Sequence, residues 1–404
     1  MRIVILAALA AVLSGAAPGA AQTLPSEPIV LGDGHLTIGG GVSASFAPVD
    51  PGYFNDTDYD HSSLRLLRME VTAALAAGRH VTVLGDLRSE NLDAPQPYAL
   101  YLRVRPWASR AFDIQVGRVP PTFGAFARRT YASDNLLIGY PLAYQYLTSL
   151  RPDALPANAD ELLKMRGRGW LASYSLGASG GDHGVPLVSA FRWDTGVQLH
   201  AEGAIFDATG SVTAGTPANP LFREDNSGKQ LAGRVAYHPF AGLIVGASAA
   251  RGAFAADTAA RQALGPGASG GDASVQTAWG ADVEYSRDYY LVRAEMILSR
   301  WTMPRVRQPF IDSPLSALST SLEGRYRIVP GLYAAARFDH LGFSEITGTA
   351  GRATWDAPVT RVEVGGGYSL QRNLVLKISY QYNRRDGGRV RSEHLGATQL
   401  VFWF

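Results

Sequence analysis

Apolar and polar residues alternate in long runs of this chain, most clearly near its C-terminus. In the run 373–383 every even-numbered residue is apolar or aromatic. The residues between them are mostly polar and include Lys377 and Gln381. The preceding run, 361–370, repeats the pattern after a short link. Because successive side chains of a strand point to opposite faces, the pattern predicts a hairpin of long strands with one apolar and one charged face.

The same alternation recurs at 318–328, 290–299, 279–285 and 100–105. The longer runs have about ten residues, which is the length that a tilted strand needs to cross a membrane. Strands of soluble sheets alternate too, but they are typically about 5–6 residues long. Aromatic residues gather near the ends of these runs, as expected for a belt at the membrane interface. They are Tyr285, Tyr289, Tyr290, Trp301, Tyr326 and Tyr368.

The chain ends in an apolar run from His394 to Phe404 that finishes on three aromatic residues. In a soluble protein such a strand would be an exposed, aggregation-prone edge. In a closed barrel it would pair with the first strand. The pattern therefore favours an all-β transmembrane antiparallel β-barrel, with membrane lipid as one partner. The terminal Phe404 also resembles the signal that barrel-assembly machinery recognises, which predicts a second partner.

Short turns predict the number of strands. Seven of them separate the runs, and longer Gly- or Pro-rich stretches lie between successive turns. Seven turns join fourteen strands, and one strand before them (35–46) and one after (394–404) make sixteen, which puts both termini on the periplasmic side. Eighteen strands remain possible, and we assign 170–177 to a loop. The turns are expected near 77–79, 108–110, Gly203, 239–241, 287–288, 330–331 and 371–372.

The N-terminus predicts export. A positive start, a short apolar run and small residues up to Ala21 are typical of a secretory signal peptide, here 1–21. The apolar run is too short for a membrane-spanning helix, which needs roughly 20 apolar residues. We therefore expect a short periplasmic segment at 22–34, a barrel at 35–404, and localisation in the outer membrane of a Gram-negative cell.

The composition argues against several other classes of protein. The chain has no cysteine, which excludes a disulfide scaffold, a cysteine nucleophile and thiolate metal ligands. Its formal charge of +2 does not indicate a nucleic-acid partner. It contains no H-E-x-x-H or P-loop motif, and its histidines show no metal-ligand spacing. We expect no enzyme activity, no cofactor and no metal.

The alternation disappears between residues 119 and 188, and connections of this length are usually functional. The segment is rich in aromatic residues at 140–146 and predicts a short helix at 159–165. Because it is too apolar to hang in water, we expect it to fold into the barrel and constrict or plug the pore. The alternative is an outer loop that packs on itself or at a trimer interface. The candidate constriction residues are Arg118, Arg128, Arg129, Arg166 and Arg168.

Arg128 and Arg129 are the leading selectivity candidates, because no acidic residue adjoins them in sequence. The charged positions of the alternating runs should line the lumen, because a charge facing lipid near the midplane costs about 2–4 kcal/mol. Many of them should pair with one another. The predicted lumen residues are Arg68, Arg88, Arg103, Arg105, Arg234, Arg293, Glu295, Glu323, Arg325, Arg337, Arg361, Glu363 and Lys377.

Four segments, 113–124, 194–199, 229–239 and 243–248, resemble the phosphate-selective porin O and P type of outer-membrane porin. The resemblance implies a sixteen-strand barrel, usually trimeric, with an inward-folded loop. Phosphate-selective members rely on lumen clusters of Arg and Lys. This chain has only three lysines, so phosphate specificity is not carried over.

Together these features predict a passive pore for small hydrophilic or anionic solutes, with a mild anion preference and a homotrimeric state. The competing hypothesis is a structural barrel sheath, or a plugged barrel, that houses a partner protein.

Overall fold

A computed structural model describes residues 27–57, 61–107 and 110–404 of the chain. The predicted signal peptide and two residues of the predicted turn 108–110 lie outside the described residues.

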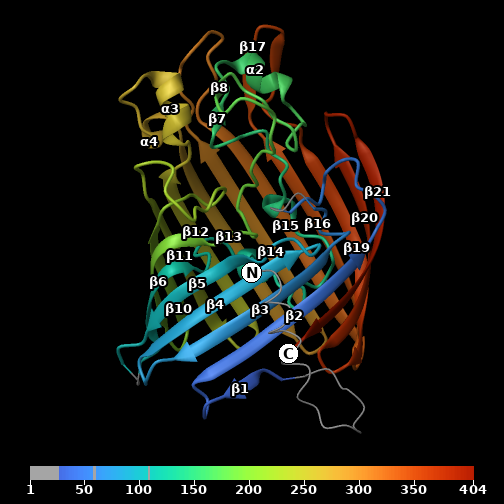
Figure 1. Cartoon of the computed structure of the whole chain (residues 1–404). Coiled ribbons are helices and arrows are strands. Elements are labelled where there is room, and N and C mark those ends of the chain that lie inside the picture. The colour runs from blue at the N-terminus through green and yellow to red at the C-terminus, as the bar shows by residue number, and fades with distance from the viewer. Residues whose placement is uncertain (1–26, 58–60, 108–109) are drawn as a thin grey trace.

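The described residues form a closed barrel of sixteen antiparallel strands (Figure 1). Each strand pairs with its neighbour in the chain, and the first barrel strand, β2, also pairs with the last, β21. The predicted strand number and parity are confirmed. The barrel strands are β2 (Leu36–Phe46), β3 (Leu67–Ala76), β4 (Val81–Glu90), β5 (Gln96–Val104), β6 (Phe112–Val119), β9 (Asp194–Glu202), β10 (Phe206–Thr213), β11 (Gln230–Phe240), β12 (Leu243–Ala253), β13 (Val275–Arg287), β14 (Tyr290–Trp301), β15 (Leu315–Val329), β16 (Leu332–Phe343), β19 (Val359–Gln371), β20 (Leu374–Arg385) and β21 (Ser392–Trp403).

Short turns lie at one end of the barrel and long connections at the other (Figure 1). At the short-turn end, β1 (Ile29–Leu31) folds back on the start of β2. The long connections form a crown over the other end. Its elements are β7 (Ala154–Leu155), α2 (Ala159–Lys164) and β8 (Leu176–Gly177), which belong to the long segment, and α3 (Asp257–Leu264), α4 (Gly270–Ala273), β17 (Glu345–Gly348) and β18 (Gly351–Thr354). The long segment also contains two 3-10 helices, η1 (Phe126–Arg128) and η2 (Leu142–Tyr144), which lie inside the barrel.

Two details of the crown match the sequence analysis. Helix α2 lies where a short helix is predicted, and the Asn158 side chain accepts a hydrogen bond from the Glu161 amide at its N-terminus. The stretch 170–177 is a loop that contributes only the two-residue strand β8. No helix in the described ranges is long and apolar enough to cross a membrane.

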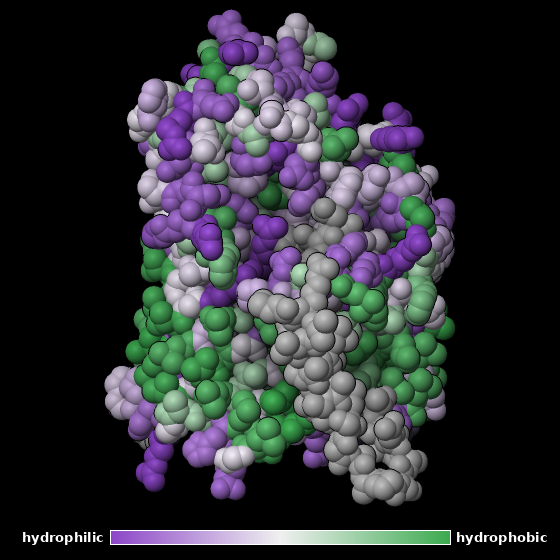
Figure 2. Space-filling model, viewed as in Figure 1, coloured by the Kyte–Doolittle hydropathy of each residue, from purple (hydrophilic) through white to green (hydrophobic). Residues whose placement is uncertain are grey.

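The strands carry an apolar face outward and a polar face inward. On β15, Leu318 and Leu322 are exposed on the outside, whereas Ser319 and Glu323 are buried inside. On the face shown in Figure 2, hydrophobic residues gather on the lower part of the barrel wall, below a hydrophilic crown. An apolar band flanked by polar ends is the surface that a bilayer accommodates.

The predicted aromatic belt is present at the short-turn end but includes one wrong residue. Tyr289, Tyr290 and Tyr326 are exposed there and pack against one another. Trp301 instead lies fully buried inside the barrel, against Phe254. Even-numbered residues of β14 face outward, so the odd-numbered Trp301 faces the lumen.

Barrel closure depends on close strand packing at several glycines. A Cβ atom on Gly366 would lie 2.3 Å from the carbonyl oxygen of Tyr333 on the adjacent strand. We predict that Gly366→Val sharply lowers the folded fraction, because the two strands must separate to admit the side chain. The heat-dependent shift in gel migration of the folded barrel measures that fraction. Gly396→Val is the matched control, since its Cβ has no atom within 4 Å. Equal folding of the two variants would contradict the packing argument.

Candidate functional site in the barrel lumen

The connection between β6 and β9 enters the barrel and bonds to strands on several sides of it. The Thr122 hydroxyl donates to Ser211 on β10 at 2.8 Å. The Tyr131 hydroxyl donates to Asp86 on β4 at 2.7 Å, and the Gly139 amide donates to Glu363 on β19 at 3.0 Å. These strands lie far apart around the barrel (Figure 1). Residues 122–147 therefore cross the lumen, as the sequence predicts; we call them the lumen segment.

The remainder of the predicted constriction loop, 148–188, lies in the crown. Its main anchor is the buried carboxylate of Asp356, which accepts hydrogen bonds from the Ser149 hydroxyl at 2.7 Å and the Gly167 amide at 2.8 Å. Burial raises the pKa of Asp356, and these hydrogen bonds oppose that rise. A second anchor joins Thr349 of the crown to Asp160 of helix α2.

The apolar side chains of the lumen segment form a core inside the barrel. Phe126 packs against Tyr140 and Tyr144, with ring centroids 5.6 and 5.0 Å apart. Tyr144 is fully buried, and its hydroxyl donates to Glu295 on β14 at 2.8 Å. Burial of this aromatic surface explains why an apolar segment leaves the solvent and enters a lumen with charged walls.

Arg337 on β16 is the centre of the most deeply buried charge cluster. Its guanidinium pairs with Asp339 at 3.1 Å, Glu323 at 3.2 Å and Glu363 at 2.6 Å. It also donates to the carbonyl of Gly139 in the lumen segment at 2.8 Å. One cation thus joins three strands of the wall to the segment.

Two further cations hold the segment by its backbone. Arg361 donates to the carbonyls of Tyr140 at 3.0 Å and Phe54 at 2.7 Å. Lys377 donates to the carbonyls of Ala132, at 2.6 Å, and Asn135. A buried carbonyl that accepts a hydrogen bond from a cation needs no water as a partner. These contacts therefore fix the segment against the wall.

On the neighbouring strands β3 and β4, two inward-facing arginines contact acidic side chains of the same wall. Arg68 binds Glu90 at 2.7 Å and the Tyr140 hydroxyl at 2.7 Å. Arg88 lies over the Tyr98 ring at 3.3 Å and within 3.6 Å of Glu70.

Across the lumen, Arg234 pairs with Asp282 at 2.8 Å. Arg293 bridges Glu284 at 3.1 Å and Glu323 at 3.3 Å. Glu295 accepts from the Ala125 amide of the lumen segment at 2.7 Å.

The predicted constriction arginines do not come together. Arg118 contacts the carbonyls of Trp193 and Pro97 on the outward side of β6, because its position has the parity of the exposed Val116. Arg166 lies in the crown, where it binds Thr354 and Asp386, and Arg168 is exposed there.

Arg129 lies inside the barrel, but the assumption that it has no acidic neighbour is wrong. It forms an ion pair with Glu284 on β13, which is 155 residues away in the chain and close in space. The side chain of Arg128 lies outside the described residues.

Three predicted lumen arginines lie toward the short-turn end. Arg105 pairs with Asp113 at 2.9 Å and is half exposed. Arg103 and Arg325 are partly buried, and neither has a carboxylate within ion-pair distance among the described residues. Arg325 has Arg293 and Arg327 as like-charged neighbours. The alternation of β15 places Arg327 on the inward face too, next to Arg325.

Two Gly-x-Ser-x-Gly sequences, 177–181 and 267–271, lie in the crown. A nucleophilic serine of this motif sits between a strand and a helix, at the top of a parallel sheet. Here the Ser269 hydroxyl instead donates to Asp272 at 2.7 Å and caps helix α4. Among the described residues, no cluster of three or more acidic or histidine side chains could hold a metal ion.

No protein-family model and no curated protein sequence matches this chain. Among solved structures, outer-membrane-expressed OmpT of Vibrio cholerae has a TM-score of 0.56 at 13% identity, covering 93% of this chain and 100% of that chain. An anion-selective porin from Comamonas acidovorans has a TM-score of 0.55 at 10% identity, covering 91% and 99%. The channel DcaP of Acinetobacter baumannii has a TM-score of 0.51 at 10% identity, covering 94% and 100%. Such similarity shows the fold, which is the closed β-barrel of outer-membrane porins and channels.

The buried cluster at Arg337 yields a stability prediction. Arg337→Ala leaves Glu323, Asp339 and Glu363 without their shared cation in a site that excludes water. Breaking a buried ion pair by removing one partner costs about 3–5 kcal/mol, and we expect a loss of this size in the free energy of unfolding. Urea unfolding of the barrel in detergent micelles measures it. Arg327→Ala, at an exposed position nearby, is the control and should change stability little. Similar losses in both variants would contradict the assignment.

Proposed function

We propose that the protein is an outer-membrane porin through which small hydrophilic solutes diffuse passively. The observation that carries the proposal is a closed sixteen-strand barrel with an apolar outer face and a charged inner face. Barrels of about this size enclose enough space for an aqueous path. Similarity to porins and channels over more than 90% of the chain supports the same function.

The orientation follows from the connections. Short turns face the periplasm and long loops face outward in barrels of this kind. The crown would then face the cell exterior, with the exported chain cleaved after Ala21 and Phe404 available to the assembly machinery. We further propose a homotrimer; OmpT of Vibrio cholerae has been solved in a trimer form.

The solute path is proposed to run along the side of the lumen segment where charged groups keep contact with solvent. Arg129, Glu284 and Arg293 are each about one-fifth to one-quarter exposed. Nearer the short-turn end, Arg325 on β15 and Arg103 on β5 face the lumen from opposite walls of the barrel. Because these last two cations lack a carboxylate partner among the described residues, they favour anions. We assign the mild anion preference to them rather than to Arg128 and Arg129. The lysine-poor lumen gives phosphate no particular support.

A specific observation favours a second candidate. The lumen segment is hydrogen-bonded to β4, β10, β14 and β19, and its aromatic core is buried. A segment held on so many sides could seal the lumen, which is the plugged-barrel hypothesis. For the barrel to enclose a partner protein, the lumen segment would have to move out of the lumen.

Current across a planar bilayer separates the two functions. Under the porin proposal, the reconstituted protein gives discrete, stable open-channel steps, and the reversal potential in a salt gradient shows a modest preference for the anion. A barrel that is verified as folded but never conducts would contradict the porin proposal and support the plugged barrel.

A double variant tests the assignment of the anion preference to Arg103 and Arg325. Arg103→Gln combined with Arg325→Gln removes the two unpaired lumen cations, so the anion-to-cation permeability ratio should fall toward one. Arg384→Gln is the matched control, because Arg384 is exposed on the outward face of β20. An unchanged ratio in the double variant would remove the assignment while leaving the pore intact.

A further inference from the structure

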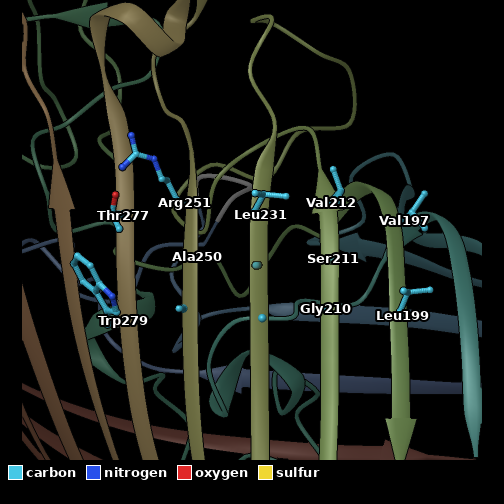
Figure 3. A pocket seen from close by; sticks show the side chains of 13 residues that line it. Val197, Leu199, Gly210, Ser211, Val212, Leu231, Ala250, Arg251, Thr277 and Trp279 are labelled. Atoms are coloured by element: carbon cyan, nitrogen blue, oxygen red, sulfur yellow. The ribbon is translucent and has the colours of Figure 1, made fainter.

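The outward face of β9–β13 has a groove with a volume of about 600 Å³ (Figure 3). Strand register places its floor and walls in one row across the barrel. Gly210, Gly233 and Ala249 are adjacent in that row, with Leu199 on one side and Trp279 on the other. The floor is low because two of its positions carry no side chain. The volume falls in the range of about 300–1,000 Å³ that is typical of ligand sites.

Two arginines lie along the upper edge of this groove. Register aligns Arg251 on β12 with Thr277 on β13, and Thr277 with Arg300 on β14. Both arginines are exposed on the outward face, and Arg300 lies over the Trp279 ring at 5.5 Å. Neither has a carboxylate within ion-pair distance among the described residues. Figure 3 shows Arg251 and Thr277 above Trp279 at this end of the groove.

The depth of the arginines in the bilayer identifies the group they would meet. Arg251 is eight residues from Leu243, where β12 begins at the short-turn end. At about 3.3 Å per residue and a strand tilt of about 40°, this separation is roughly 20 Å along the barrel axis. The apolar band of such barrels is about 25 Å tall, so Arg251 and Arg300 lie near its upper edge, at the level of lipid headgroups.

We propose that this groove binds a phosphorylated lipid of the outer leaflet, with an acyl chain over Gly210 and Gly233 and a phosphate between Arg251 and Arg300. The inference rests on the outer-membrane placement proposed above. Charge complementarity favours this occupant, because guanidinium groups bind phosphate through two parallel hydrogen bonds. A second copy of the chain would have to supply carboxylates at this height as well as side chains that fill the floor.

Native mass spectrometry of the folded full-length barrel, titrated with diphosphoryl lipid A, tests the proposal. Wild type should retain the lipid, and Arg251→Gln with Arg300→Gln should weaken retention at least tenfold. Phosphatidylcholine should bind weakly to both proteins. Millimolar inorganic phosphate should not displace lipid A, because the acyl chain contributes to binding.

A second pair of variants tests the groove itself. Gly210→Leu with Gly233→Leu fills the floor, and added Cβ atoms there meet no atom closer than 3.9 Å, so the barrel should still fold. This variant should also lose lipid A. Gly324→Leu, on the outward face of β15 and with similarly open space, is the matched control for the glycines, and Arg384→Gln is the control for the arginines.

Lipid retention that equals wild type in the arginine or the groove variant would overturn the proposal. So would a change in subunit number confined to these variants, which would show that a second copy covers the groove. Channel conductance should stay at the wild-type level in all four variants, so a failed lipid site is distinguishable from a failed pore.

Discussion

The structure depends on one constraint, which is that backbone polar groups inside a bilayer have no water to bind. A sheet that spans the bilayer must therefore close on itself. Here closure is the pairing of β2 with β21, in which Gly41 aligns with Trp403 and Phe46 with Thr398. Once the sheet is closed, every strand has an outer face in lipid and an inner face in the lumen. The alternating sequence, the even strand number and the position of both ends of the barrel on one side all follow from this closure.

The inner face has to satisfy charges that cannot face lipid. Some of these charges form ion pairs along the wall. Others bind the lumen segment, whose backbone carbonyls accept hydrogen bonds from Arg337, Arg361 and Lys377. The segment thus completes the hydrogen bonding of the wall, and the wall fixes the position of the segment. Arg129 and Glu284 remain partly exposed beside the segment, and this is the side on which we propose the solute path.

The sequence predicts the barrel well because the bilayer imposes a period of two that is visible residue by residue. That period also places Glu363 and Lys377 on the inner face correctly, and it could have excluded Trp301 from the aromatic belt. The sequence does not predict which side chains pair across the lumen. Arg129 and Glu284 are 155 residues apart, and no local pattern joins them. The division of 119–188 into a lumen part and a crown part likewise depends on distant contacts, such as those of Asp356 with Ser149 and Gly167.

The central claim is that solutes pass through a lumen that the segment 122–147 narrows. Ser133 is exposed within the segment, beside the carbonyl of Ala132 that Lys377 holds, and the chain has no cysteine of its own. The most direct measurement is the single-channel current of Ser133→Cys before and after a positively charged thiol reagent, with labelling verified by mass. The account predicts a stepwise fall in current as the added group enters the path. Complete labelling with unchanged current would contradict it.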